Sequence, residues 1–109
     1  MKTTFGRRIA CGIALAAALQ APAHAWDKSS HGTIAVTEVT AGQNFGYRVW
    51  LDGEPALCSN GLGWAYLLET DSNYKTFVAA LLMAKAMRNP VTVHTSLQNG
   101  YCHIEHIAF

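Results

Sequence analysis

The sequence is short of charge, above all of positive charge. Only 14% of its 109 residues are charged, and eight lysines and arginines stand against seven acidic residues. Three of the eight bases lie in the first 25 residues and all seven acids follow them, so residues 26–109 carry five bases and a net charge of −2. A nucleic-acid-binding surface needs clustered lysine and arginine. This composition therefore argues against a nucleic acid as partner.

Long apolar runs are also absent. No run reaches the roughly 20 residues that a membrane-spanning helix needs. The longest, residues 9–19, follows the basic residues Lys2, Arg7 and Arg8 and precedes the small-residue stretch "AHA" at residues 23–25. This order is typical of a secretory signal peptide. We expect residues 1–25 to be cleaved, which leaves residues 26–109 as one domain, periplasmic or secreted, without a membrane span.

Cysteine is scarce as well. Of three cysteines, Cys11 lies in the expected signal peptide, so Cys58 and Cys102 remain. In an oxidising compartment, an isolated pair in so small a domain predicts a disulfide. The alternative, a reactive thiol or a metal ligand, would need a partner residue close by in the sequence, and neither cysteine has one.

The sequence does contain alternating segments typical of β-strands and one helical segment. We expect strands over residues 32–42, 44–53, 64–69, 90–96 and 101–109, and a helix over residues 72–88. Asp71 or Ser72 can cap the start of the helix, and Asn89 and Pro90 can end it. The order β-β-β-α-β-β, with the helix between strands three and four, predicts a mainly β fold, an OB-like five-stranded small barrel. A twisted α+β sheet with the helix on one face is the alternative.

The expected helix is apolar on two faces. One face carries Tyr74, Phe77, Val78, Leu81 and Leu82, and the other includes Ala80, Met83, Ala84 and Met87. The first face can cover the end of the barrel. The second is either simply alanine-rich, because alanine is the best helix former, or it is an interface with another copy of the chain. We favour a homo-oligomer, because methionine suits adaptable contacts and an exposed apolar patch usually marks an interface.

A candidate ligand-binding surface lies on the second expected strand. Arg48 and Trp50 are alternate residues of this strand, on the face expected to point away from the core. An exposed tryptophan beside an arginine can bind a sugar ring or a partner protein. The alternative is that Trp50 packs under the helix or a loop. Ser29 and Ser30 precede the first expected strand and are further candidate ligand contacts, or else part of a flexible, solvated lead-in.

The same alternation sorts the remaining aromatic side chains. Phe45 and Tyr47 share the inward parity, and Trp64 and Tyr66 share a face with Leu68. We expect both sets to belong to the core. By the same reasoning His106, which shares the parity of Ile104, is expected at the edge of the core.

His94, His103 and Glu105 form the one cluster of metal-type ligands in residues 26–109. Across an antiparallel hairpin His94 would neighbour His103 or Glu105, and two histidines with a carboxylate can bind zinc. Their spacing matches no known metal signature, so we favour solvated polar positions and expect no metal and no cofactor. Nothing in the sequence brings together a nucleophile, a base and an orienting group, so we expect the protein not to be an enzyme.

Three stretches carry a family resemblance. "TAGQNFGYRVWLDG" (residues 40–53) and "MAKAMRNPVTV" (residues 83–93), with the element order and the cysteine pair, resemble the B subunits of bacterial AB5 toxins of the subtilase-cytotoxin and typhoid-toxin type. "NYKTFVAALLMAK" before "PVTV" is similar to small uncharacterised secreted proteins of Gram-negative bacteria, and this second likeness is the closer one. It implies no activity.

The toxin resemblance implies a pentameric ring, with its helices around a central pore, that binds host glycans. The chain departs from that family in having "RVWL" where the toxin subunits carry a cysteine, and in offering no fixed match for their sugar-binding serine. Together the residues and the resemblance predict a self-associating, non-catalytic protein that binds a glycan or an envelope protein. The alternatives are an envelope structural or interaction protein and a metal-binding protein.

Overall fold

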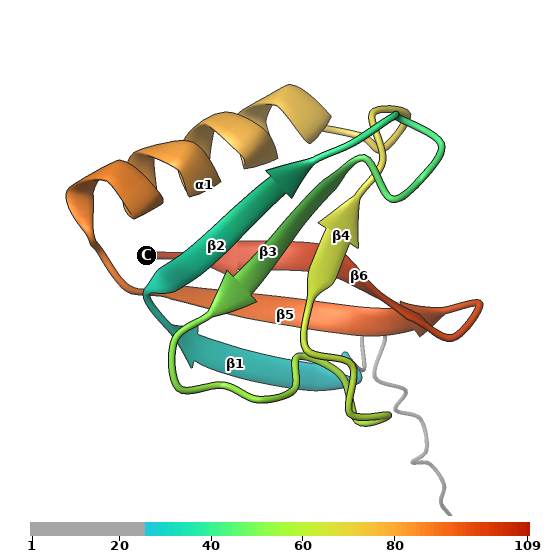
Figure 1. Ribbon diagram of the computed structural model, residues 1–109, viewed down its shortest axis with the longest axis horizontal. Helices are drawn as coiled ribbons and strands as arrows, with labels where there is room; N and C mark the ends of the chain where they lie inside the picture. Colours follow the sequence, from blue (N-terminus) through green and yellow to red (C-terminus); the bar gives the residue numbers. More distant parts are fainter. Residues whose placement is uncertain (1–25) are drawn as a thin grey trace, which may run out of the picture.

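Six strands and one helix follow one another in residues 26–109, which are the residues that the computed structural model describes (Figure 1). The elements are β1 (Lys28–Gly32), β2 (Ile34–Val39), β3 (Tyr47–Leu51), β4 (Ala65–Leu67), α1 (Tyr74–Met87), β5 (Val91–Gln98) and β6 (Tyr101–Ala108). The expected signal peptide lies outside the described residues. Within them, no helix is long and apolar enough to cross a membrane.

All six strands belong to one mixed sheet with the order β1-β5-β6-β4-β3-β2. Neighbouring strands are antiparallel except β4 and β6, which are parallel. A mainly β fold with a single helix is therefore confirmed. The sheet is open and has six strands, so the five-stranded barrel is not confirmed.

The additional strand is β1, in a stretch expected to be a solvated lead-in. It pairs with β5 along its whole length, from Lys28 opposite Thr95 to Gly32 opposite Val91. Only Thr33 separates β1 from β2, yet the two strands lie at opposite edges of the sheet. The strand expected over residues 32–42 is thus the shorter strand β2, and β1 is separate from it because the chain changes direction at Thr33.

Asp52 fixes this change of direction. Its backbone N–H donates to the carbonyl of Thr33 (2.8 Å), and its carboxylate accepts a hydrogen bond from the Thr33 hydroxyl (2.8 Å). A Cβ on Gly32 would lie 2.9 Å from the Asp52 carbonyl oxygen. Glycine is therefore needed at this position so that the end of β3 can approach the bend.

The core lies between the sheet and α1, which covers one face of it (Figure 1). The helix contributes Leu81 and Ala84, which is only 2% exposed. Ala84 is therefore not part of an exposed helix face, contrary to expectation, because it lies three residues after Leu81 and so on the same side of the helix. Leu82, expected in the core, is exposed instead.

The two ends of α1 use other residues than those expected. The N-cap residue is Asn73, with a φ of 61° and no side-chain capping bond, rather than Asp71 or Ser72. At the other end the left-handed residue is Arg88 (φ 57°) and not Asn89. Asp71 is not available as a cap because its carboxylate is bonded elsewhere, as described below.

The predicted disulfide between Cys58 and Cys102 is confirmed, with the two Cα atoms 5.7 Å apart. It ties the loop between β3 and β4 to β6, and both cysteines are buried. Buried Thr95 of β5 supports the same loop, because its hydroxyl donates to the Leu57 carbonyl (2.6 Å). The buried part of this loop, Leu57 and Cys58, is thus held in the core while the rest of the loop lies at the surface.

We predict that replacing both cysteines (Cys58→Ala with Cys102→Ala) lowers the free energy of unfolding by about 4 kcal/mol, the loop-entropy estimate for a crosslink across 44 residues. Denaturant titration without reductant measures the loss. The parent with its disulfide reduced is the matched control and should lose a similar free energy of unfolding. A double variant as stable as the oxidised parent would contradict the prediction.

Candidate functional site: the outer face of the sheet

The sheet has an outer face, on the side away from α1. A row of side chains crosses it from strand to strand. In the register of the sheet Arg48 lies opposite Tyr66, Tyr66 opposite His103, and His103 opposite Ser96. Side chains alternate along a strand, and the strand neighbours of Arg48, Tyr66 and His103 belong to the core. The row therefore joins β3, β4, β6 and β5 on the outer face.

An aromatic cluster, Phe45, Trp64, Tyr66 and Tyr101, covers one end of this face. Phe45 is its centre, with ring centroids 4.5 Å from Tyr101, 4.8 Å from Tyr66 and 5.6 Å from Trp64. The rings of Trp64 and Tyr101 are 5.8 Å apart. Such tilted and edge-on contacts are favourable for aromatic rings, so the four side chains hold one another in place.

Three members of the aromatic cluster were expected in the core. Phe45 leaves the parity of β3 because its φ of 55° is left-handed. In β4 the core residues are Ala65 and Leu67, so Trp64 and Tyr66 lie on the outer face. Tyr66 is only 4% exposed, but it is covered by neighbouring rings instead of by the core.

Arg48 and Trp50, the predicted ligand-binding pair, lie beside the aromatic cluster. The Arg48 guanidinium carbon is 5.1 Å from the Trp64 ring centroid, within cation–π range, and the Trp50 and Trp64 rings are 6.4 Å apart. Tyr101 is the most exposed aromatic of the group, at 38%. The face therefore offers open ring surface next to a cation.

The predicted serines do not join this face. Both are on β1, at one edge of the sheet. Ser30 is buried and so is not available to a ligand, because the pairing of β1 with β5 turns it inward. Ser29 is exposed, and its hydroxyl lies 2.5 Å from Nδ1 of His94.

A polar cluster, Asp71, Ser96, Gln98, His103 and Glu105, occupies the other end of the outer face. Nε2 of His103 lies 2.8 Å from Oδ2 of Asp71, and Nδ1 of His103 bonds to Oε2 of Glu105. The same Oε2 accepts hydrogen bonds from the Ser96 hydroxyl (2.8 Å) and the Gln98 amide (3.1 Å). With a carboxylate at each ring nitrogen, His103 satisfies both only as the imidazolium, because both nitrogens must donate.

The carboxylates set the charge of the polar cluster. Burial alone lowers the pKa of His103, but hydrogen bonds to Glu105 and Asp71 and their negative charges outweigh it, so the pKa is raised. For Glu105, burial acts to raise the pKa, but hydrogen bonds from His103 and Ser96 and the charge of His103 lower it overall. The cluster thus holds a cationic imidazole between two anions.

The metal site considered from the sequence is not assembled. His103 and Glu105 meet, but His94 pairs with His106, and Trp26 stacks on it with ring centroids 4.0 Å apart. A bulge between His94 and its neighbour Thr95 shifts the register, which also leaves His106 exposed instead of at the core edge. Within residues 26–109 no group of three or more histidines, cysteines or acids could hold a metal ion.

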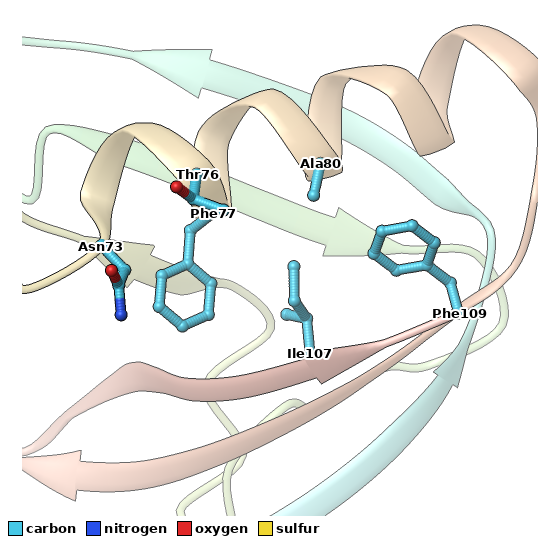
Figure 2. Close-up of a pocket in the computed structure, with 6 residues that line it drawn as sticks. All are labelled: Asn73, Thr76, Phe77, Ala80, Ile107 and Phe109. Carbon is cyan, nitrogen blue, oxygen red and sulfur yellow. The ribbon is translucent and has the colours of Figure 1, made fainter.

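A separate groove of about 310 Å³ lies between α1 and the end of β6. Figure 2 shows Phe77 and Ala80 of the helix facing Ile107 and Phe109. Its six lining residues include no charged side chain, and Asn73 and Thr76 at one end are the only polar ones, so it offers mainly apolar area. No protein-family model, curated protein or solved structure matches the chain. The outer face is therefore chosen as the candidate site because of its own side chains, the aromatic cluster and the polar cluster.

We predict that His103 makes stability depend on pH. Because its folded pKa is raised above the ordinary value near 6.5, its contribution is complete below that value and is lost as the pH rises through the folded pKa. Unfolding free energies measured from pH 6 upward should fall for the parent. The fall should be absent for His103→Gln, in which the lowered pKa of His94 leaves the unfolding free energy level or slightly rising with pH. An identical slope in both proteins would contradict the assignment.

Proposed function

We propose that the protein is an exported, non-catalytic binding protein that holds a saccharide on the aromatic cluster. The observation that carries the proposal is the exposed ring of Tyr101 beside Trp64, with Arg48 and the polar cluster adjoining. Aromatic surface with a few convergent polar groups is the usual chemistry of a small-ligand site. The disulfide fits an oxidising compartment outside the cytoplasm, which supports export with cleavage before Trp26.

An OB-like barrel is the finer description of the fold that we propose. It is supported by the parallel pairing of β4 with β6, by the place of α1 between β4 and β5, and by the continuity of β1 and β2 through Thr33. OB-folds bind oligosaccharides and oligonucleotides on their second and third strands and the adjoining loops. The corresponding strands here are β3 and β4, and Phe45 and Tyr101 adjoin the corresponding loops. The net negative charge of residues 26–109 favours a saccharide over a nucleic acid.

We predict that Tyr101→Ala weakens saccharide binding about tenfold or more, equivalent to roughly 1.4 kcal/mol. The substitution removes the most accessible ring and opens the contact with Phe45. Screening the oxidised protein on a glycan array, followed by calorimetric titration of the strongest ligand, measures the change. Leu97→Ala is the matched control, because Leu97 is similarly exposed (41%) in the same hairpin but lies outside the aromatic cluster.

Equal affinities for the parent, Tyr101→Ala and Trp64→Ala would contradict a saccharide site on the aromatic cluster. An array without any signal from folded protein would also contradict it. In that case the same face becomes a candidate surface for an envelope protein, to be captured from envelope extract with Tyr101→Ala as the comparison.

We also propose self-association through the exposed side of α1. Leu82, Met83 and Met87 are 48%, 60% and 61% exposed there. The other two residues expected on this side are less exposed, because Ala80 lines the groove and is half-buried and Ala84 lies in the core. An apolar surface of this kind on a small domain usually marks an interface.

We predict that the parent forms a discrete oligomer and that Met83→Glu with Met87→Glu converts it to a monomer, because carboxylates cannot be buried unpaired at an interface. Light scattering on a size-exclusion column, without reductant, gives both masses. Val39→Glu is the control, since Val39 is apolar and even more exposed (75%) but lies on β2. A monomeric parent would overturn the proposal.

A further inference from the structure

We infer that the polar cluster is the hydrogen-bonding end of the saccharide site, with Glu105 accepting sugar hydroxyls and His103 as its positioning residue. The ligand class that this arrangement takes is a neutral, hydroxyl-rich oligosaccharide. The inference depends on the proposed saccharide function and adds the specificity of the site to it.

The two clusters form one continuous surface. Tyr101, His103 and Glu105 alternate on the outer side of β6, so Tyr101 and Glu105 lie about 13 Å apart along the strand. Gln98 bridges this span, because it pairs with Tyr101 in the sheet while its amide donates to Glu105. Tyr66 provides a second link, with its ring 5.2 Å from that of His103. A short oligosaccharide stacked on the rings can therefore reach the carboxylate.

Glu105 is held ready to accept hydrogen bonds. Ser96, Gln98 and His103 all bond to its Oε2, and no hydrogen bond from the described residues goes to Oε1. The side chain is 31% exposed, and Oε1 is its oxygen that accepts no hydrogen bond from these residues, which leaves Oε1 as the acceptor for a ligand. A carboxylate fixed on one oxygen loses little freedom when the other binds, and charge-assisted bonds to hydroxyls are strong.

The charges of the face favour neutral sugars over acidic ones. Its two cations are already matched, since Arg48 lies 3.6 Å from Glu38 and His103 lies between Asp71 and Glu105. Three carboxylates therefore face two cations, so a sugar carboxylate would have to compete with a protein carboxylate for either cation. An acidic sugar at Glu105 would meet a like charge.

The same arrangement makes binding depend on pH. The titratable groups that face His103 are Asp71 from the loop before α1, Glu105 on its own strand and Tyr66 on β4, while β5 contributes only uncharged Ser96 and Gln98. Burial, with the charges of Asp71 and Glu105, raises the pKa of Tyr66, which stays neutral in this range. When His103 loses its proton, one of its two donated hydrogen bonds is lost and Glu105 is held less firmly.

We predict that the parent binds neutral oligosaccharides on an array that also carries sialylated and uronic-acid-terminated ones, and that Glu105→Gln weakens the strongest neutral ligand about tenfold in calorimetric titration. Glu69→Gln is the matched control, an exposed carboxylate outside both clusters. Gln98→Ala, which removes only a surface support of Glu105, should weaken binding severalfold even if Glu105→Gln does not fold.

Measuring the affinity as a function of pH tests the role of His103. The parent should lose affinity as the pH rises through the raised pKa of His103, whereas His103→Gln should bind more weakly and without that step. Preference for acidic glycans, or unchanged binding in both Glu105→Gln and Gln98→Ala, would overturn the inference. If Tyr101→Ala still abolishes binding in that case, the saccharide function stands and only the role of the polar cluster fails. Unchanged binding in Tyr101→Ala, or no binding by the parent, would overturn both.

Discussion

The disulfide between Cys58 and Cys102 is the constraint on which both the core and the outer face depend. It holds the loop between β3 and β4, with buried Leu57, against β6. A domain of this length buries only about 60% of its unfolded surface, so a crosslink of about 4 kcal/mol is a large share of its stability. Because the bond fixes Cys102 inward, strand alternation turns Tyr101 and His103 outward. The crosslink in the core thus sets the orientation of residues from both surface clusters.

Much of the fold was predictable from the sequence because its strong signals are local. The disulfide pair, the helix before Asn89 and Pro90, and the alternation in β3 and β6 all follow from composition and spacing. The strand β1 was not predictable, because "KSSHG" has no apolar alternation and is held by backbone pairing with β5. The bend at Thr33 depends on Asp52, a residue distant in sequence, so the break between β1 and β2 also left no local sign.

The site was predictable where one of the two faces of a strand is clearly polar, and it was not predictable where the residues of both faces are apolar. Arg48, Trp50, His103 and Glu105 were correctly placed on the outer side of their strands. In "WAYLL" every residue can be buried, so Trp64 and Tyr66 were assigned to the wrong face until the core position of Ala65 and Leu67 decided it. Phe45 was missed because its left-handed backbone breaks the alternation, and Asp71 because a helix cap was the nearer explanation.

The polar cluster is more ordered than stability alone would require. An ion pair near the surface typically contributes only about 0–1 kcal/mol, so a histidine between two carboxylates adds little to a domain that already has a disulfide. What the arrangement does determine is the orientation of one carboxylate, since three donors converge on Oε2 of Glu105. Fixing an exposed acceptor in this way lowers the entropic cost of binding a ligand. Tyr66 lies close to that acceptor and Tyr101 pairs with its donor Gln98, at the end of the aromatic surface, which is the arrangement that the proposed saccharide site requires.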